Sequence, residues 1–332
     1  MRDYSLRFSA IAVAVFLLTV FAEWRLIPIL RSHKAGQRIL EIGPRWHKSK
    51  EGTPTMGGIG FIFAALIVSA AFFIVRAVRG TAETEIPLAL TLAYAAANGA
   101  IGFVDDYCKL VKKQNEGLTW YQKLILQIAV AVAYVTVMSY TGSIDSSVEL
   151  PFSGKILELG WLFYPAAVVI LVGVVNGANL TDGIDGLASS VTFVIGGLFA
   201  LISFVWRDLS LGLIGAILLG ATLGFLIYNF HPAKVFMGDT GSLFLGALVI
   251  GSAFMLNAVS AGLILAGVFI FEMLSSFLQV LYFKLTHGKR LFRMAPFHHH
   301  LEKCGWNEYA IVGFFTACEI LLCVVAWFAI GA

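Results

Sequence analysis

The hydrophobic residues of this chain fall into long runs separated by short polar segments. A helix that crosses a membrane needs ~20 mostly apolar residues, with a range of about 17–25. The pattern predicts ten such spans, at residues 8–30, 57–78, 87–104, 122–140, 161–178, 187–206, 209–228, 242–258, 261–284 and 309–331. The fifth is the hardest to delimit because it runs into the Gly- and Asn-rich stretch 176–179. We therefore predict an all-α integral membrane protein, with a single polytopic membrane domain over residues 1–332.

The composition supports this prediction. Hydrophobic residues make up 59% of the chain and charged residues 13%, whereas a soluble domain has ~45–50% and ~25%. The four cysteines have no CxxC spacing, so they indicate neither a zinc site nor a disulfide framework.

The positive charges predict the orientation. Sixteen of the 23 Lys and Arg residues lie in loops on one side of the predicted spans and six on the other. Loops rich in Lys and Arg face the cytoplasm, so this side is predicted to be cytoplasmic. Ten spans then place both termini outside. All the distinctive polar motifs fall on the basic side, which predicts an active site facing the cytoplasm.

An aspartate pair, Asp105-Asp106, directly follows the third apolar run, and Lys109 comes one helical turn later. The simplest interpretation is a solvated helix end. However, ionised carboxylates at a membrane helix end are costly unless they are paired, hydrated or bound to a metal. Two carboxylates beside a lysine also suit phosphate chemistry, because one can relay a proton while the lysine offsets phosphate charge.

Two further aspartate motifs lie in later loops on the same side. Asp182 and Asp185 are flanked by Gly183 and Gly186, and glycine allows the backbone to approach a ligand closely. Asp239 belongs to a Gly-Asp-x-Gly-Ser turn that suits a hard cation, since Mg²⁺ takes one or two carboxylates with waters and phosphate oxygens. In both loops the alternative is an aspartate that caps a helix.

Three consecutive histidines, His298, His299 and His300, follow Arg290 and Arg293. Successive residues do not face one point, so a zinc site is not expected. An imidazole can donate to phosphate or exchange a proton near neutral pH.

Other classes of site lack support. No Walker A sequence and no GxGxxG in a strand–helix context occur in the chain. The basic loops flank membrane spans, which favours membrane lipid and substrate phosphate as partners and no nucleic acid.

Together these motifs resemble the polyprenyl-phosphate N-acetylhexosamine-1-phosphate transferase superfamily and, within it, the phospho-N-acetylmuramoyl-pentapeptide transferases. The resemblance covers nearly the whole chain. It rests on GTPTMGG (52–58), GFVDDY (102–107), NLTDGIDGLA (179–188), residues 229–242 and MAPFHHHLE (294–302). Leu301 stands where the family often has Phe.

The resemblance implies a Mg²⁺-dependent enzyme of the bacterial inner membrane, usually a homodimer. It transfers phospho-N-acetylmuramoyl-pentapeptide from UDP-N-acetylmuramoyl-pentapeptide to undecaprenyl phosphate, giving lipid I and UMP. This is the first membrane step of peptidoglycan synthesis, and so of cell wall growth, cell shape and division.

The resemblance also implies roles for individual residues. Asp239 is the Mg²⁺ ligand, Asp105 the base acting on the lipid phosphate, with Asp106 beside it, and His298 faces the phosphates. The substrate-binding set is Lys50, Thr55, Lys109, Lys123, Asn176, Asn179, Asp182, Gly183, Asp185, Asn229, Phe236, Gln279, His299 and His300, with Phe236 stacking on uracil. Direct displacement and a covalent aspartyl intermediate are both compatible with this set.

Two alternatives stay open at this point. The nearer is a transferase of N-acetylglucosamine-1-phosphate from the same superfamily. The farther is a transporter of lipid-linked or nucleotide compounds, which needs polar groups near the membrane midplane. Only Glu272 and Glu319 are candidates for such groups.

Overall fold

The computed structural model describes residues 2–32, 50, 52–81, 83–112 and 117–331. Five basic residues used above to predict the orientation, Lys34, Arg38, Arg45, Lys48 and Lys113, lie outside these ranges. Ten helices of the described part are long and apolar enough to cross a membrane. The prediction of an all-α protein with ten spans is confirmed.

The spanning helices run in order along the chain. They are α1 (Arg2–Ser32), α2 (Gly58–Val78), α3 (Ile86–Lys112), α4 (Trp120–Tyr140), α5 (Phe163–Thr181), α6 (Leu187–Trp206), α7 (Leu209–Asn229), α8 (Gly238–Met255), α10 (Gly267–Leu285) and α12 (Glu308–Ala329). Two short helices, α9 (Val259–Leu265) and α11 (Phe297–Lys303), precede the last two spans. Strands β1 (Ser147–Glu149) and β2 (Ile156–Glu158) form a small antiparallel hairpin between α4 and α5.

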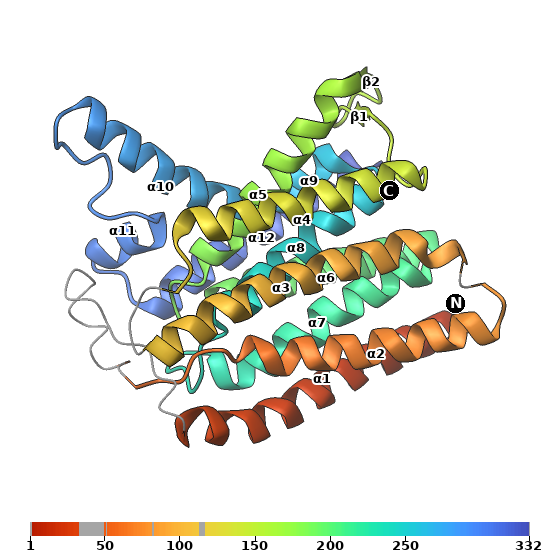
Figure 1. The fold of residues 1–332 in the computed structure, drawn as a ribbon, viewed down its shortest axis with the longest axis horizontal. Coiled ribbons are helices and arrows are strands. Elements are labelled where there is room, and N and C mark those ends of the chain that lie inside the picture. Colours follow the sequence, from red (N-terminus) through yellow and green to blue (C-terminus); the bar gives the residue numbers. More distant parts are fainter. Residues whose placement is uncertain (1, 33–49, 51, 82, 113–116, 332) are drawn as a thin grey trace.

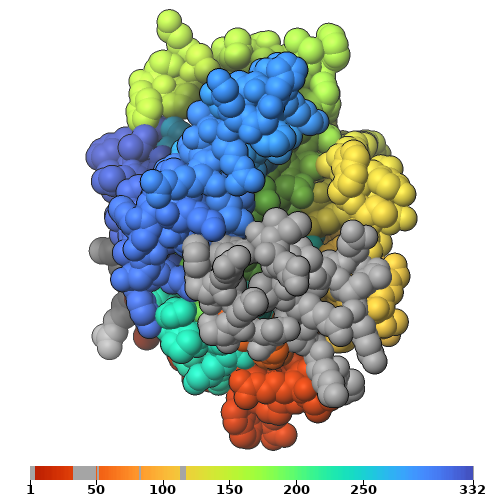
Figure 2. Space-filling model, turned by 90° about the vertical axis from the view of Figure 1, so that its left-hand side faces the viewer, coloured from red at the N-terminus to blue at the C-terminus, as the bar shows by residue number. Residues whose placement is uncertain are grey.

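Helix α8 forms the centre of the bundle. It packs against α3, α5 and α2, and 83% of its membrane-spanning window is buried, against 11% for α1. The two chain ends lie at the same end of the bundle, as an even number of spans requires, and the loops that carry the polar motifs lie at the other (Figure 1). Figure 2 looks onto that loop-bearing end, which is framed by α4 in yellow and α10 in blue.

Several helix boundaries differ from the hydrophobic pattern. Helix α3 continues eight residues past the predicted end at Val104, so Asp105, Asp106 and Lys109 are helical. Helix α8 begins at Gly238, which places Asp239 in its first turn. The predicted span 261–284 is interrupted at Ala266, whose backbone is not helical, just before Gly267, a residue with low helix propensity.

Candidate active site

The candidate active site lies where α3, α4, α5 and α8 meet at the loop-bearing end. Three carboxylates form its centre: Asp105 and Asp106 near the end of α3, and Asp239 in the first turn of α8. Their oxygens lie within 4.8 Å of one another. The sequence separates Asp239 from the Asp105–Asp106 pair by more than 130 positions, so only the packing of α3 against α8 brings them together.

Close packing of α3 against α8 depends on Gly102. A Cβ on Gly102 would lie 2.6 Å from the backbone nitrogen of Thr240 and closer still to the carbonyl of Asp239. Only glycine therefore allows the two backbones to approach this closely. The contact sits one helical turn from Asp105 and Asp106, and it sets their distance from Asp239.

Two lysines neutralise the cluster. The Lys109 ammonium lies 2.6 Å from Asp105, 3.5 Å from Asp106 and 3.4 Å from Asp239. The Lys123 ammonium on α4 donates to Asp239 Oδ2 at 2.6 Å and to Asn179 Oδ1 at 3.2 Å. Two cations beside three carboxylates leave a net negative site that can hold a further cation.

The carboxylates are held by different donors. Asp106 Oδ2 accepts from the backbone nitrogen and hydroxyl of Thr240 at 2.9 and 2.8 Å, and so caps the start of α8. Asp105 Oδ1 accepts from the backbone nitrogen of Leu118 at 2.8 Å. Asp239 Oδ1 accepts from the Asn179 amide at 2.9 Å. Asp106 and Asp105 are buried, and Asp239 is partly exposed.

The residues present fit a hard divalent cation. Mg²⁺ prefers carboxylate oxygens and keeps several waters or phosphate oxygens in its shell. The three aspartates offer such oxygens within one small volume. The Lys109 ammonium already lies within reach of all three, which shows that the position attracts positive charge.

A second polar cluster joins Lys50, Asp185, His231 and Glu308. Lys50 bridges Asp185 and Glu308, each at 2.7 Å. His231 Nδ1 lies 3.0 Å from Asp185, which also accepts from the backbone nitrogen of Ala233 at 2.9 Å. This network ties the start of α12 and the α7–α8 loop to the turn that carries Asp185.

The turn after α5 contains Asp182, whose pKa is raised well above its usual range. Burial is the largest cause, followed by the nearby charges of Asp239, Asp106 and Asp185. Asp182 and Asp185 do not share a helix face, because α5 ends at Thr181 and residues 182–186 form the turn.

His298 lies beneath this turn and is buried. Its Nδ1 lies 2.9 Å from Glu272, which also accepts from its backbone nitrogen. A Cβ on Gly183 would lie 2.7 Å from the His298 ring carbon Cε1 and closer still to Nε2. The structure therefore places His298 in contact with Gly183, so that the imidazole supports the turn.

Several other predicted site residues hold loops in place. Gln279 accepts from the backbone nitrogen of Phe292 at 2.8 Å, and His300 accepts from that of Arg293 at 3.1 Å. Both bonds fix the segment between α10 and α11. His299 Nδ1 lies 2.6 Å from Glu302.

The remaining predicted residues lie around the start of α8 and on α5. Asn229 is buried and bonds Gly186, Ser189 and Val235. The segment with Thr55 pairs with Phe236, whose backbone nitrogen donates to Pro54 at 2.8 Å and whose carbonyl accepts from Gly57 at 2.9 Å. Asn176 bonds Gln127 on α4 at 2.8 Å.

Sequence reasoning missed His231, Glu308 and Gln127. His231 lies within the 229–242 motif, but nothing in the pattern indicates its partner. Glu308 reads as an ordinary first-turn acidic residue of α12, and Gln127 as one polar residue in an apolar run. Only the packing shows their contacts.

Two pockets flank the site. One of about 300 Å³ is lined by Trp120, Lys123, Leu124, Gln127 and Asn176. A larger one of about 460 Å³ lies between α6, α7 and α12, and none of its lining residues is charged. Phosphate chemistry therefore favours the smaller pocket, which shares Lys123 with the carboxylate cluster.

Comparison with known proteins gives consistent matches. A family model described as glycosyl transferase family 4 matches residues 88–257. The phospho-N-acetylmuramoyl-pentapeptide-transferase of Bacillus subtilis strain 168 is 42% identical over 310 residues, 93% of this chain and 94% of that protein. The protein of the same name from Halalkalibacterium halodurans is 40% identical over 311 residues, 94% of each chain. The one from Bacillus cereus strain AH187 is 40% identical over 314 residues, 95% of each chain.

Proposed function

The chain belongs to the phospho-N-acetylmuramoyl-pentapeptide transferases of glycosyl transferase family 4, and from this premise we propose how its site performs the reaction. The enzyme transfers phospho-N-acetylmuramoyl-pentapeptide from UDP-N-acetylmuramoyl-pentapeptide to undecaprenyl phosphate, with lipid I and UMP as products. The observation that carries the proposal is the cluster of Asp105, Asp106 and Asp239 with Lys109 and Lys123 at the end of a membrane bundle.

Asp239, with Asp105 and Asp106 beside it, would hold Mg²⁺. When bound, the ion neutralises the charge that develops on the diphosphate. Lys109 and Lys123 add positive charge on either side of Asp239, and they position the phosphates for in-line transfer.

Asp105 is the residue that takes a proton from the acceptor phosphate in this proposal. It follows directly on the apolar part of α3, where we expect the lipid headgroups to lie, and Lys109 holds it at 2.6 Å. Asp106 caps α8, which suits a role in positioning Asp239. All three carboxylates already accept hydrogen bonds, an arrangement that favours direct displacement over attack by an aspartate.

The donor substrate lies on the cytoplasmic side in this proposal. Its binding residues would lie in and around the turn after α5 and near the start of α8, where an anionic nucleotide sugar can approach from water. They are Lys50, Thr55, Asp182, Gly183, Asp185 and Phe236. His298, tied to Glu272, keeps Gly183 in place. The homodimer remains a prediction from the family resemblance.

The activity test uses purified protein in detergent with undecaprenyl phosphate and Mg²⁺. We expect UMP release with UDP-N-acetylmuramoyl-pentapeptide and none with UDP-N-acetylglucosamine, and chelation should stop turnover. The reverse preference would identify the N-acetylglucosamine-1-phosphate transferase, and absence of UMP with both donors would leave the transporter as the better hypothesis.

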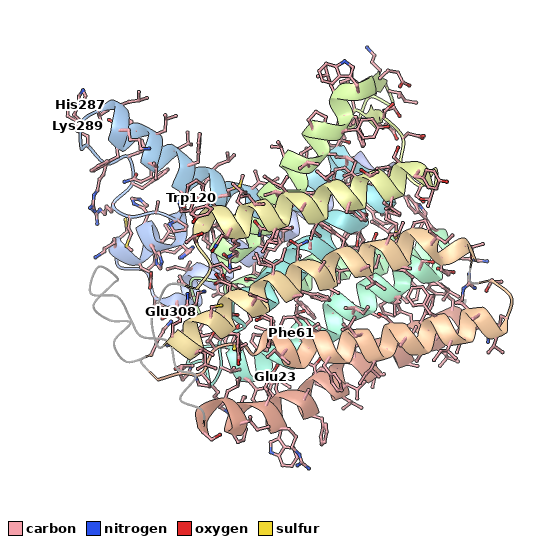
Figure 3. All side chains as sticks on the ribbon, viewed as in Figure 1. Glu23, Phe61, Trp120, His287, Lys289 and Glu308 are labelled. Atoms are coloured by element: carbon pink, nitrogen blue, oxygen red, sulfur yellow. The ribbon has the colours of Figure 1, made fainter. Side chains whose placement is uncertain are left out.

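The orientation is tested by single-cysteine labelling in a variant without the four native cysteines. Lys289→Cys, at the exposed tip between α10 and α11, should react only after the cells are permeabilised (Figure 3). Lys155→Cys, in the hairpin at the opposite end, is the matched control and should react in intact cells. Labelling of position 289 from outside intact cells would show that the orientation is the reverse of the one proposed.

A further inference from the structure

Gln127 is a buried polar residue inside a membrane span. It lies on α4, its side chain is 1% exposed, and it lines the pocket of about 300 Å³ with Trp120, Lys123, Leu124 and Asn176. That volume is at the lower end of the range for small-molecule sites, about 300–1,000 Å³.

The orientation of the Gln127 amide follows from its neighbours. Asn176 donates from Nδ2 to the backbone carbonyl of Val172 at 2.8 Å, and a carbonyl can only accept. The same Nδ2 lies 2.8 Å from Gln127, so the Gln127 atom that faces it must be the acceptor Oε1. The donor Nε2 therefore points elsewhere.

Within the described part of the chain, Gln127 Nε2 has no hydrogen-bond partner. A buried donor without a partner is unfavourable, and folded proteins seldom keep one without a reason. In a membrane span, bulk water is a poor substitute. The unpaired donor therefore indicates an oxygen ligand that is bound during function.

Gln127 is aligned with the catalytic cluster. It lies four residues after Lys123, so the two side chains share one face of α4. Lys123 contacts Asp239, and the pocket continues from there into the membrane span. Trp120, which is 78% exposed, lies at the loop-bearing end of α4 on the side toward α10 (Figure 3).

We propose that Gln127 Nε2 donates a hydrogen bond to a phosphate oxygen of the acceptor lipid and, with Lys123, fixes this phosphate beside Asp105. This inference rests on the proposed transferase function. The acceptor fits better than the nucleotide sugar because Trp120 and Leu124 make the pocket wall apolar and because α4 is a membrane span. Asp182, Gly183, Asp185 and Phe236, which are assigned to the nucleotide substrate, belong to the α5–α6 turn and the α7–α8 loop.

Two variants and a matched control test the proposal. Gln127→Leu removes the donor, while Asn176 Nδ2 keeps its bond to Val172. Gln127→Glu keeps an acceptor for Asn176 but places a carboxylate oxygen where the donor was. Gln122→Glu is the control, since Gln122 is exposed on the same helix and accepts from the Thr119 nitrogen, as glutamate also can.

The measured quantities are the KM for undecaprenyl phosphate, the KM for the nucleotide substrate, kcat and the Tm. We expect Gln127→Leu to raise the KM for the lipid about tenfold, because a hydrogen bond to the charged phosphate is lost. Gln127→Glu should raise this KM further, because its carboxylate also repels the phosphate. The nucleotide KM should stay within about twofold, and Gln122→Glu should match the wild type.

Two results would overturn the inference. An unchanged lipid KM in both Gln127 variants would show that Gln127 Nε2 does not bind the acceptor lipid, whatever happens to kcat or Tm. A raised nucleotide KM with an unchanged lipid KM would assign the pocket to the sugar. A wild-type enzyme that releases no UMP would instead refute the proposed function, so the two failures are distinguishable.

Discussion

Replacement of Gly102 by alanine is expected to disrupt the active site without changing any polar side chain. The new Cβ would lie 2.6 Å from the Thr240 backbone nitrogen, about 0.8 Å short of the 3.4 Å of an ordinary contact. It would meet the backbone of Asp239 even closer. Backbone atoms cannot rotate away as a side chain can, so α3 and α8 must separate.

The size of this separation gives the expected effect. Because the Asp239 carbonyl lies closer still, the shift must exceed about 0.8 Å, which stretches the 2.9 Å bond from Thr240 to Asp106 beyond normal range and moves Asp239 away from Lys109. Overpacking of this kind costs about 1–3 kcal/mol of stability. Misplacement of reacting groups by about 1 Å can lower turnover by ~10²-fold.

The assay compares three alanine variants by UMP release and by Tm in detergent. Gly197 on α6 has open space where a Cβ would lie, so Gly197→Ala should keep wild-type activity. Gly99 on α3 would meet Ile62 at 3.2 Å and Phe244 at 3.3 Å, so Gly99→Ala should give an intermediate loss. Gly102→Ala should lose the most.

The order of the three variants decides the outcome. A Gly102→Ala enzyme with more than about half of wild-type turnover would refute the argument that α3–α8 spacing sets the cluster, because ~10²-fold is expected. Equal losses for Gly99→Ala and Gly102→Ala would show that helix packing in general, and not the contact at Asp239, controls activity.

Three further predictions concern single aspartates of the candidate active site. Asp239→Asn should abolish most Mg²⁺-dependent turnover, because one neutral amide oxygen replaces an anionic ligand of a hard cation; near-normal activity at low Mg²⁺ would place the metal elsewhere. Asp105→Asn should lose turnover mainly below pH ~6, the second pKa of a phosphate, and recover as the acceptor ionises unaided; an equal loss at every pH would contradict the base assignment. The raised pKa of Asp182 means that its ionisation opposes folding, so Asp182→Asn should raise the Tm increasingly as pH rises above ~4, the unfolded value; a Tm gain confined to acid would refute this.

The sequence alone determined the class of the protein and most of its spans. Long apolar runs are a local property, and residues 187–206 form a helix with the bounds that the pattern predicts, because membrane helices satisfy their own backbone hydrogen bonds. The motifs also identified Asp105, Asp106 and Asp239 as candidate catalytic and metal-binding residues, since carboxylates at membrane helix ends need a partner. The roles assigned to them from the family resemblance remain predictions that the experiments above test.

The tertiary structure decided where helices end and which polar groups meet. Helix α3 continues past Val104 because Asp105 pairs with Lys109 and Asp106 accepts from Thr240. The hydropathy of the sequence contains no information about such contacts. Lys123 and Asp239, 116 residues apart, form their ion pair only when α4 packs beside α8. The unpaired amide of Gln127 appears only once Asn176 and Val172 fix its orientation. The contacts of Thr240 with Asp106, Lys123 with Asp239 and Asn176 with Gln127 join different helices, so their geometry exists only after the helices have packed.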